Sequence, residues 1–388
     1  MRHLLKKNRF FEVFDAISTF FQYKYKIKRD PSTTRPLRVL VIQNAKMGDM
    51  VCSTPVFQAV KKFSPEVILA VGGNMINKEL LEHGSLIDTY IIFNNLDPEG
   101  TLSKIKEFKA DFACVLTPDY FGLKLLMKAK IPLISVPKIE NGLSPHETKL
   151  FKFLRTAIAS KPHMMGHYVP REYLRLLEPI GIYESNTKKV LGYSIEAKNK
   201  VRETFEKHFG ELNIGISPSA GNKIKQWPAE RFAEIADYCM KTLNAKVFVI
   251  NGMGNIKESK EMIKNLSQRD SIVDLTGQLS LDELKAFIST LDLFIAVDTG
   301  PIYIAEAFDV ATIDIVGPVD ENEQPPKGEF NIVVVPERNK PAIHLMNTKQ
   351  FDQVEAKRQI ESITSQQVIE AINLMNKRLL LRKKQKKS

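Results

Sequence analysis

Short apolar runs alternate with helix-forming stretches along the first half of the chain. Runs of this length, apolar throughout, are typical of parallel strands that are buried on both faces. Strands that alternate with helices predict an α/β, doubly wound domain. The strand candidates of this half are Leu37–Gln43, Val67–Val71, Thr89–Phe93, Phe112–Leu116 and Ile131–Val136.

The same alternation starts again after residues 181–211, which we expect to connect two domains. Two Rossmann-like halves leave a cleft between the carboxyl ends of their strands, where such sheets bind ligands. We therefore predict one domain over 36–185 and another over 205–350, facing a central cleft. The strands of the second are predicted at Asn213–Ser217, Lys246–Ile250, Ser271–Leu275, Leu293–Val297 and Thr312–Val316, and its helices at Ala229–Leu243, Lys257–Leu266, Leu281–Thr290 and Pro301–Phe308.

Both ends of the chain differ from these domains. In the N-terminal segment 1–30, Phe10, Phe14, Ile17 and Phe21 recur at helical spacing between lysines and arginines. This pattern fits a helix that lies in a membrane interface, and it equally fits a helix packed on the protein's own body. At the other end we predict a long helix over 352–378 that returns toward the first domain, and then a basic tail over 379–388.

The net charge of +11 is concentrated in these ends. Residues 1–30 hold eight Lys/Arg and three Asp/Glu, and residues 376–388 hold seven Lys/Arg and no acid, so the body between them is close to neutral. A nucleic-acid enzyme usually carries a basic groove in its body. The charge therefore favours an anionic membrane surface over nucleic acid as a partner. The three cysteines lack CxxC spacing, which fits a reducing cytoplasm without a disulfide or zinc framework.

The turn after the first strand carries a candidate for acid–base chemistry. In Asn44-Ala45-Lys46-Met47-Gly48-Asp49, the carboxylate of Asp49 lies where the next helix begins, facing the expected cleft. A carboxylate there can take a proton from an acceptor hydroxyl as a general base. A helix cap explains the same position, and position alone favours the cap. The turn lacks the GxGxxG spacing of dinucleotide-binding proteins.

A loop in the second half is suited to a phosphate. It follows the strand at 213–217 and contains Ser219, Ala220 and Gly221, whose small size lets backbone N–H groups approach a phosphate. Lys225 adds a compact positive charge. A surface loop with solvated lysines remains the alternative explanation.

Two further turns of the second half have ligand-binding character. Asp298-Thr299-Gly300-Pro301 leads from a strand into a helix that contains Tyr303, and a helix N-terminus of this kind binds anions. Asn251-Gly252-Met253-Gly254 is followed by Glu258, whose carboxylate is placed to bind a ribose diol. An ordinary capped turn and a solvated helix face explain these two segments as well.

The order of these segments over residues 37–320 resembles glycosyltransferase family nine, the bacterial lipopolysaccharide heptosyltransferases. The resemblance implies the GT-B architecture, in which the second domain holds most of the nucleotide-sugar donor. The segments that carry it are Arg38-Val39-Leu40-Val41-Ile42 running into Met47-Gly48-Asp49, Thr54-Pro55, Lys225-Gln226-Trp227-Pro228-Ala229-Glu230-Arg231-Phe232, Asp274-Leu275-Thr276-Gly277, Leu281-Asp282-Glu283-Leu284, Asp298-Thr299-Gly300-Pro301 and Gly317-Pro318.

The resemblance also implies roles for individual residues. Asp49 matches the catalytic base and Lys225 a lysine on the donor's phosphates. The donor site further includes the loop Ser219, Ala220 and Gly221, the ribose-binding candidate Glu258, the base-binding Thr276 and Gly277, and the phosphate- and sugar-facing Asp298, Thr299, Gly300 and Pro301, with Tyr303 beside them. The family usually has histidine where this chain has Tyr303.

We therefore expect an inverting glycosyltransferase that moves heptose from ADP-heptose to a lipopolysaccharide core or a similar phosphorylated, lipid-linked saccharide. It would work at the cytoplasmic face of a bacterial inner membrane, with the nucleotide sugar as substrate and no cofactor. The chain has no Asp-x-Asp pair, which fits phosphate binding without a metal ion. A nucleotide-sugar epimerase of the same architecture and a non-catalytic, membrane-associated relative are the alternatives.

Overall fold

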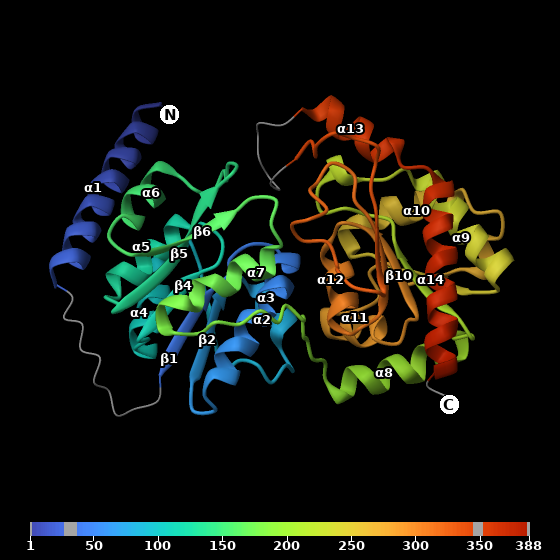
Figure 1. The fold of residues 1–388 in the computed structure, drawn as a ribbon, viewed down its shortest axis with the longest axis horizontal. Coiled ribbons are helices and arrows are strands. Elements are labelled where there is room, and N and C mark those ends of the chain that lie inside the picture. Colours follow the sequence, from blue (N-terminus) through green and yellow to red (C-terminus); the bar gives the residue numbers. More distant parts are fainter. Residues whose placement is uncertain (1, 27–36, 344–351, 386–388) are drawn as a thin grey trace. The chain divides into compact units, whose positions relative to one another are not determined.

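The computed structural model describes residues 2–26, 37–343 and 352–385, and in the first of these ranges the side chains of residues 11–24. The chain divides into two compact units (Figure 1). Unit 1 comprises Met1–Lys78 and Ser85–Lys188, and unit 2 comprises Glu79–Gly84 and Lys189–Ser388.

Unit 1 is built on a six-stranded sheet in the order β3-β2-β1-β4-β5-β6, in which every neighbouring pair is parallel. This is the Rossmann order, and it reverses direction between β1 and β4. The strands are β1 (Arg38–Ile42), β2 (Ile68–Gly73), β3 (Thr89–Ile92), β4 (Phe112–Val115), β5 (Leu133–Glu140) and β6 (Ala159–Met164); the helices are α1 (Arg2–Lys26), α2 (Met47–Phe63), α3 (Met75–Leu81, ending in unit 2), α4 (Pro98–Phe108), α5 (Tyr120–Lys128), α6 (Lys149–Arg155), α7 (Val169–Leu174) and the 3₁₀ helix η1 (Arg175–Ile180).

Unit 2 repeats this design in the order β12-β11-β10-β7-β8-β9, again with parallel neighbours and a reversal between β7 and β10. Its strands are β7 (Asn213–Ser217), β8 (Lys246–Val249), β9 (Val273–Asp274), β10 (Leu293–Val297), β11 (Ala311–Ile315) and β12 (Asn331–Val334); its helices are α8 (Ile195–Phe205), α9 (Ala229–Leu243), α10 (Ile256–Lys264), α11 (Leu281–Ile288), α12 (Gly300–Ala307), α13 (Gln353–Ser362) and α14 (Ser365–Gln385), with 3₁₀ turns η2 (Glu206–His208), η3 (Lys223–Lys225), η4 (Met253–Asn255) and η5 (Arg269–Ser271).

Two doubly wound sheets confirm the predicted α/β fold class. β7, β10 and α9 have the predicted bounds. The sequence analysis missed β6 and β12, the last strand of each sheet. Both are edge strands: β6 contains Lys161 and Pro162, which interrupt its apolar pattern, and β12 spans only four residues, fewer than any strand predicted from the sequence.

The helical segment near the C-terminus differs from the prediction of a single helix over 352–378. The chain forms two helices there, α13 and α14, and both are part of unit 2. Ile360, Ile363 and Ile372 lie in the apolar core of this unit with Trp227, whose Nε1 donates to the carbonyl oxygen of Ile363 at 2.9 Å. This core therefore depends on residues close to the end of the chain.

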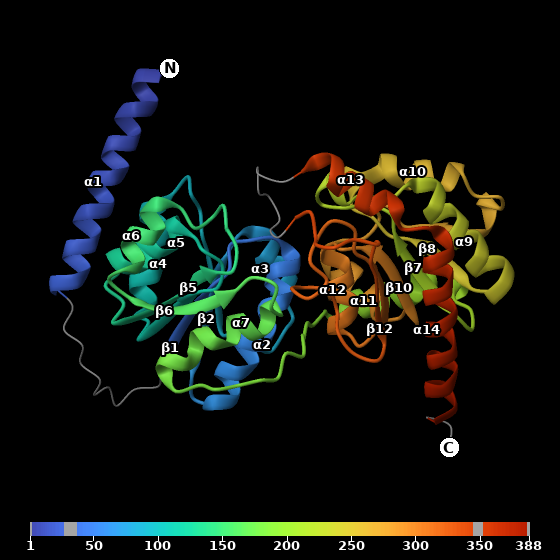
Figure 2. The same cartoon turned by 45° about the horizontal axis from the view of Figure 1, so that its top comes forward.

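Helix α1 packs on α5 and α6 of unit 1, along which it lies in Figures 1 and 2. Ala16 and Tyr23 are buried there, and the Tyr23 hydroxyl donates to the carbonyl oxygen of Ile131 at 2.9 Å. Packing on the protein's own body thus accounts for one face of this helix. Among the described helices, none is both long enough and apolar enough to span a bilayer.

Replacing Ile372 by Ala should destabilise unit 2 by about 2–5 kcal/mol, because this fully buried side chain leaves a cavity between α14 and the sheet. Leu374→Ala, on the same helix but 46% exposed, should change stability by about 0.5 kcal/mol. Urea unfolding followed by the fluorescence of Trp227, the only tryptophan, measures both. Equal effects would place α14 outside the core.

Candidate active site

Asp49 lies at the reversal point of the unit 1 sheet, in the first turn of α2 after β1. Its side chain is half-buried, and Oδ2 accepts a hydrogen bond from the backbone N–H of Lys46 at 3.2 Å. The carboxylate therefore does stabilise the start of the helix. A carboxylate has about four lone-pair positions, so this bond is compatible with a second role as a proton acceptor.

A cluster of buried polar side chains supports the turn that carries Asp49. Ser53 Oγ donates to the backbone carbonyl of Asp49 at 2.7 Å and accepts from Gln43 Nε2 at 3.2 Å. Thr117 Oγ1, at the end of β4, donates to Gln43 Oε1 at 3.1 Å and lies 3.2 Å from the Tyr173 hydroxyl. Burial, and then the charge of Asp49, raise the pKa of Tyr173 well above its usual range, so this hydroxyl remains protonated.

The sequence analysis did not identify this cluster. Its members come from β1, α2, the end of β4 and α7, and they are brought together only by the sheet and the packing of α7 on α2. The position of Gln43, directly after the last residue of an apolar strand, was the one signal available from the sequence.

In unit 2 the structure brings together three of the predicted residues. Lys225, at the end of η3, donates from Nζ to Asp298 Oδ2 at 2.8 Å and to the backbone carbonyl of Asp298 at 2.5 Å. The Tyr303 hydroxyl donates a short hydrogen bond to the other carboxylate oxygen, Oδ1. All three side chains are almost fully buried, between 2% and 5% exposed. The predicted phosphate-binding lysine is thus held by an ion pair at the reversal point between β7 and β10.

The predicted phosphate loop is closed by a neighbouring side chain. Gln226 Oε1 accepts from the backbone N–H of Ala220 at 3.0 Å, and Gln226 Nε2 donates to the carbonyl of Pro218. The amide of Ala220 is therefore engaged within the loop. Gly221 is exposed, and a Cβ atom there would meet nothing within 4 Å.

A chain of hydrogen bonds connects the carboxyl ends of β7, β8 and β9. Ser219 Oγ donates to Asn251 Oδ1 at 2.5 Å, and Asn251 Nδ2 donates to Ser259 Oγ at 2.7 Å. Thr276 Oγ1 donates to the same Ser259 oxygen at 2.8 Å. Two predicted residues, Ser219 and Thr276, are therefore joined through Asn251 and Ser259, to which the sequence analysis assigned no such role.

Gly277 is held by its backbone conformation and close contacts, whereas the side chain of Glu258 is not held by a polar contact among the residues with described side chains. Gly277 has a left-handed φ of +70°, and an added Cβ would lie 2.2 Å from Met253 Sδ. Its N–H donates to the carbonyl of Asn251 at 2.8 Å. Glu258 lies half-buried in the first turn of α10, where its carboxylate has no hydrogen-bond or ion-pair partner among the residues with described side chains.

The first turn of α12 is the predicted anion site. Thr299 is the N-cap residue, and its side chain makes no capping hydrogen bond. Gly300 and Pro301 form the first turn, directly after the buried ion pair. Pro301 has no N–H, and the N–H of Ile302 donates to the carbonyl of Thr299 at 3.2 Å, so this turn offers a phosphate the N–H of Gly300 and the positive end of the helix dipole.

A second layer of charge lies beneath α12. Lys189 is fully buried, with Nζ 2.7 Å from Glu306 Oε2 and 5.9 Å from the centre of the Tyr303 ring. Asp314, in β11, is also fully buried, and neither oxygen has a hydrogen-bond partner among the described residues. Burial, and then the negative charge of Asp298, raise the pKa of Asp314 well above its ordinary value. The sequence analysis missed Glu306 and Asp314 because they lie within apolar runs, and it missed Lys189 because this residue follows another lysine in a polar connecting segment.

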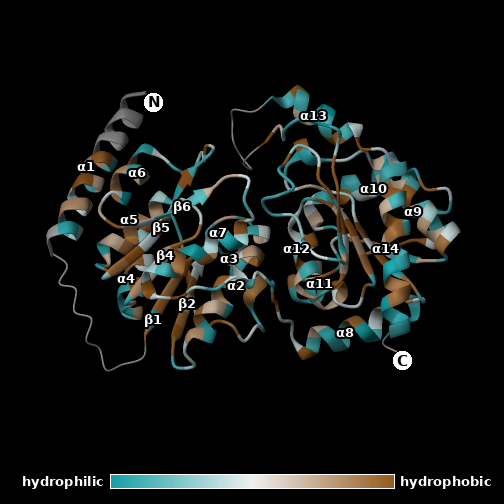
Figure 3. Cartoon of the chain, in the orientation of Figure 1, coloured by the Kyte–Doolittle hydropathy of each residue, from teal (hydrophilic) through white to brown (hydrophobic). Residues whose placement is uncertain are grey.

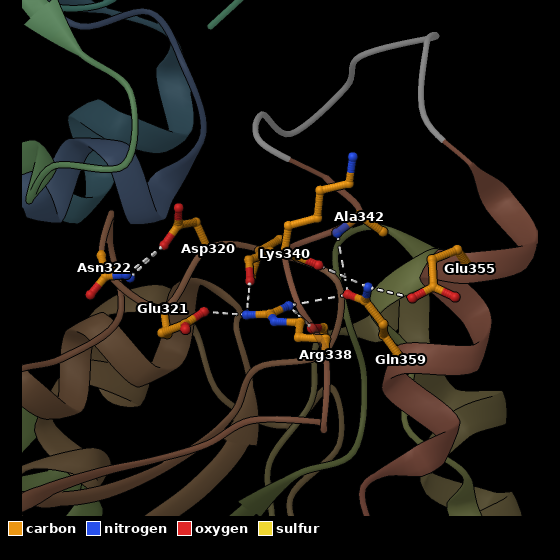
Figure 4. Close-up of polar contacts among 10 residues, drawn as sticks. Asp320, Glu321, Asn322, Arg338, Lys340, Ala342, Glu355 and Gln359 are labelled. Atoms are coloured by element: carbon orange, nitrogen blue, oxygen red, sulfur yellow. Dashed lines mark hydrogen bonds and ion pairs between the residues drawn. The ribbon is translucent and has the colours of Figure 1, made fainter. Parts of the chain in front are cut away.

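The segment after β11 is fastened by one arginine (Figure 4). Arg338 donates to the carbonyls of Gly317 and Val319, the latter at 2.7 Å, and pairs with the carboxylate of Glu321. It also donates to Gln359 Oε1 of α13 at 3.2 Å. The Gly317-Pro318 turn, which follows the strand next to β10, is therefore tied to α13.

Asp49 thus belongs to unit 1, and all the predicted donor-binding residues belong to unit 2, after β7, β8, β9 and β10. In the part of the chain that the structure describes, no group of three or more His, Cys, Asp or Glu side chains is arranged to hold a metal ion. The three cysteines are buried free thiols.

Replacing Asp314 by Asn should flatten part of the pH dependence of stability. Because burial raises its pKa, the folded state keeps a proton that the unfolded state loses above about pH 4, so stability falls as pH rises. The unfolding free energy of the wild type minus that of Asp314→Asn should therefore decrease with pH, by at most about 1.4 kcal/mol per unit. Denaturation followed at Trp227 measures it, and parallel curves would contradict it.

Comparison with known proteins places this arrangement in a family. Residues 124–354 match the sequence profile of glycosyltransferase family 9 (heptosyltransferase). Lipopolysaccharide heptosyltransferase 3 of Escherichia coli (strain K12) is 24% identical over 283 residues, which cover 70% of this chain and 80% of that protein.

Two solved structures have the same fold. The glycosyl transferase family 9 protein from Veillonella parvula DSM 2008 superposes with a TM-score of 0.71 at 19% identity, covering 90% of this chain and 100% of the other. E. coli ADP-heptose lps heptosyltransferase II gives 0.71 at 18% identity, covering 89% and 100%. Since the family match spans more than half of its length, this chain, with two Rossmann-like units in the GT-B architecture, belongs to glycosyltransferase family 9, the heptosyltransferase family, and is a glycosyltransferase.

Proposed function

We propose that this protein is an inverting, metal-independent heptosyltransferase that moves heptose from ADP-heptose to a lipopolysaccharide core or a similar phosphorylated, lipid-linked saccharide. The observation that carries the proposal is the buried Lys225–Asp298 pair at the start of α12. The sugar and the nucleotide follow the name of the similar E. coli ADP-heptose lps heptosyltransferase II, and the acceptor follows the names of both E. coli relatives. The nucleotide sugar is a substrate, and the proposal includes no cofactor.

Unit 2 would bind the donor. Its diphosphate would meet the ammonium of Lys225 and the positive N-terminal end of α12, so that these groups stabilise the charge that grows on the leaving group. Asp298 and Tyr303 support this role by fixing the lysine, because Tyr303 holds one carboxylate oxygen while the other accepts from Lys225. The hydrogen-bonded side chains of Ser219, Asn251, Ser259 and Thr276 would lie against the nucleoside. Gly277 would lie next to the base, and Glu258 next to the ribose.

Unit 1 would activate the acceptor. Asp49 would remove the proton from the acceptor hydroxyl, whose oxygen attacks the anomeric carbon from the face opposite the diphosphate. The bond to the diphosphate oxygen breaks as the new bond forms, so one displacement inverts the configuration. Asp49, Lys225 and Asp298 are all present with ordered polar partners, which supports an active enzyme over a non-catalytic relative.

A lipid-linked acceptor would place the reaction at a membrane. We propose the cytoplasmic face of a bacterial inner membrane, where anionic lipids attract the basic ends of the chain. The charge of residues 1–30 supports this location. The C-terminal cations contribute less, because Arg378, Arg382 and Lys383 donate to backbone carbonyls of unit 2.

Asp49→Asn should separate catalysis from helix capping. The amide oxygen can still accept from Lys46, so the melting temperature should stay unchanged, whereas kcat should fall by about 10²-fold or more because the base is lost. Transfer of heptose from ADP-heptose to a water-soluble core saccharide is the assay. Near-normal turnover would remove Asp49 from its role, and product formed from the donor alone would indicate an epimerase.

Lys225→Met should weaken ADP-heptose binding by about 10- to 100-fold, which corresponds to the loss of a charge-assisted hydrogen bond. Lys223→Met, at an exposed position of the same 3₁₀ turn, is the matched control and should bind like the wild type. Thermal shifts with ADP-, UDP- and GDP-sugars test donor identity and affinity together, and melting without ligand checks the fold of each variant. Unchanged affinity in Lys225→Met, or a preference for another nucleotide, would refute this donor assignment.

A further inference from the structure

Helix α1 is held to unit 1 by specific contacts along one face. Asp15 lies 2.6 Å from Lys128 Nζ and 3.2 Å from Lys124 Nζ, both on α5. The ring of Phe20 stacks on Phe153 of α6 with 4.8 Å between ring centres. Together with the buried Tyr23, these contacts fix the rotation of α1 about its own axis. The side chains on its other face are therefore presented in a defined direction.

That other face is apolar and exposed. The exposed fractions are 59% for Phe11, 65% for Phe14, 41% for Ile17 and 50% for Phe21. Their spacing of three, three and four residues places them in one stripe along the helix. Figure 3 shows that the described part of α1 contains several hydrophobic positions. Single exposed apolar side chains are ordinary, but a contiguous stripe of large ones marks an interaction surface.

We propose that the stripe formed by Phe11, Phe14, Ile17 and Phe21 inserts among the headgroups of an anionic lipid bilayer while the opposite face keeps α1 bound to α5 and α6. The proposal deepens the membrane location given above and rests on it. The helix would lie in the plane of the interface, with its phenyl rings at the boundary of the acyl chains.

Charge favours a lipid surface over a second copy of this chain. Residues 1–30 carry eight basic and three acidic residues, and the acidic Asp15 is already paired with two lysines of α5. Lys24 is exposed one turn beyond Phe21. Contact between two such stripes would bring two basic segments together, whereas anionic headgroups neutralise them.

The packing of α1 on α5 links the stripe to the candidate active site. α5 begins at Tyr120, and the preceding Asp119, whose carboxylate caps this helix, lies beside Asn44 in the turn that leads to Asp49. The helix that carries α1 therefore starts at the same sheet edge as the proposed base. Insertion of the stripe would fix the orientation of unit 1, and with it of Asp49, relative to a lipid-linked acceptor.

The double variant Phe14→Ser/Phe21→Ser tests the stripe. Both side chains are at least half exposed, so the fold should be retained. Co-sedimentation of the full chain with phosphatidylglycerol–phosphatidylcholine vesicles should show binding reduced by about tenfold or more. Leu96→Ser, which removes a 95% exposed leucine elsewhere on unit 1, is the control and should bind like the wild type.

Equal binding of the double variant and the wild type would overturn the proposal. A second result would also overturn it: the wild type does not bind vesicles and is a dimer in light scattering, while the double variant is a monomer. The stripe would then bind a second copy of this chain. Transfer to a water-soluble core saccharide should stay at the wild-type rate in the double variant. If the wild type fails in that assay, the proposed function fails, while the vesicle result still decides the role of α1.

Discussion

The parallel hydrogen bonding of both sheets fixes where the candidate site residues lie. Every neighbouring pair among the described strands is parallel, so all strands of a sheet end at the same edge. In each sheet the chain runs outward in one direction from the first strand and then in the other, which leaves the ends of two adjacent strands free of a covering connection. The supported turn of Asp49 occupies this place in unit 1, and the Lys225–Asp298 pair occupies it in unit 2.

The sequence predicted these places because buried parallel strands are continuous apolar runs, and the residues that follow them are polar. It did not predict the contacts made there, because they join distant residues: Lys225 and Asp298 are 73 positions apart. Asp314 was hidden for another reason, since a single carboxylate in a strand such as Ala311–Ile315 does not disturb the apolar pattern. The helix at 2–26 was foreseen as amphipathic, but which face docks depends on α5 and α6.

The proposed donor half of the site is held in place by contacts within unit 2. Lys225 has lost most of its contact with water and is compensated by Asp298, so its position does not depend on the arrival of a phosphate. Buried pairs of this kind add little to stability, because desolvation offsets most of the attraction. Such a pair instead fixes the position of the charged group. An ammonium held beside the first turn of α12 needs no rearrangement when charge develops on a leaving group.

The charged layer beneath α12 limits how this site can change during evolution. Lys189 and Glu306 compensate each other in the interior, and losing either one alone would leave an uncompensated charge at a cost of about 3–5 kcal/mol. Tyr303 places its ring centre 5.9 Å from Lys189 Nζ. A protonated imidazole there would set a second cation beside that lysine. Substitutions at residues 189, 303 and 306 should therefore occur together during evolution. A protein in which only one of these three residues has changed should be less stable.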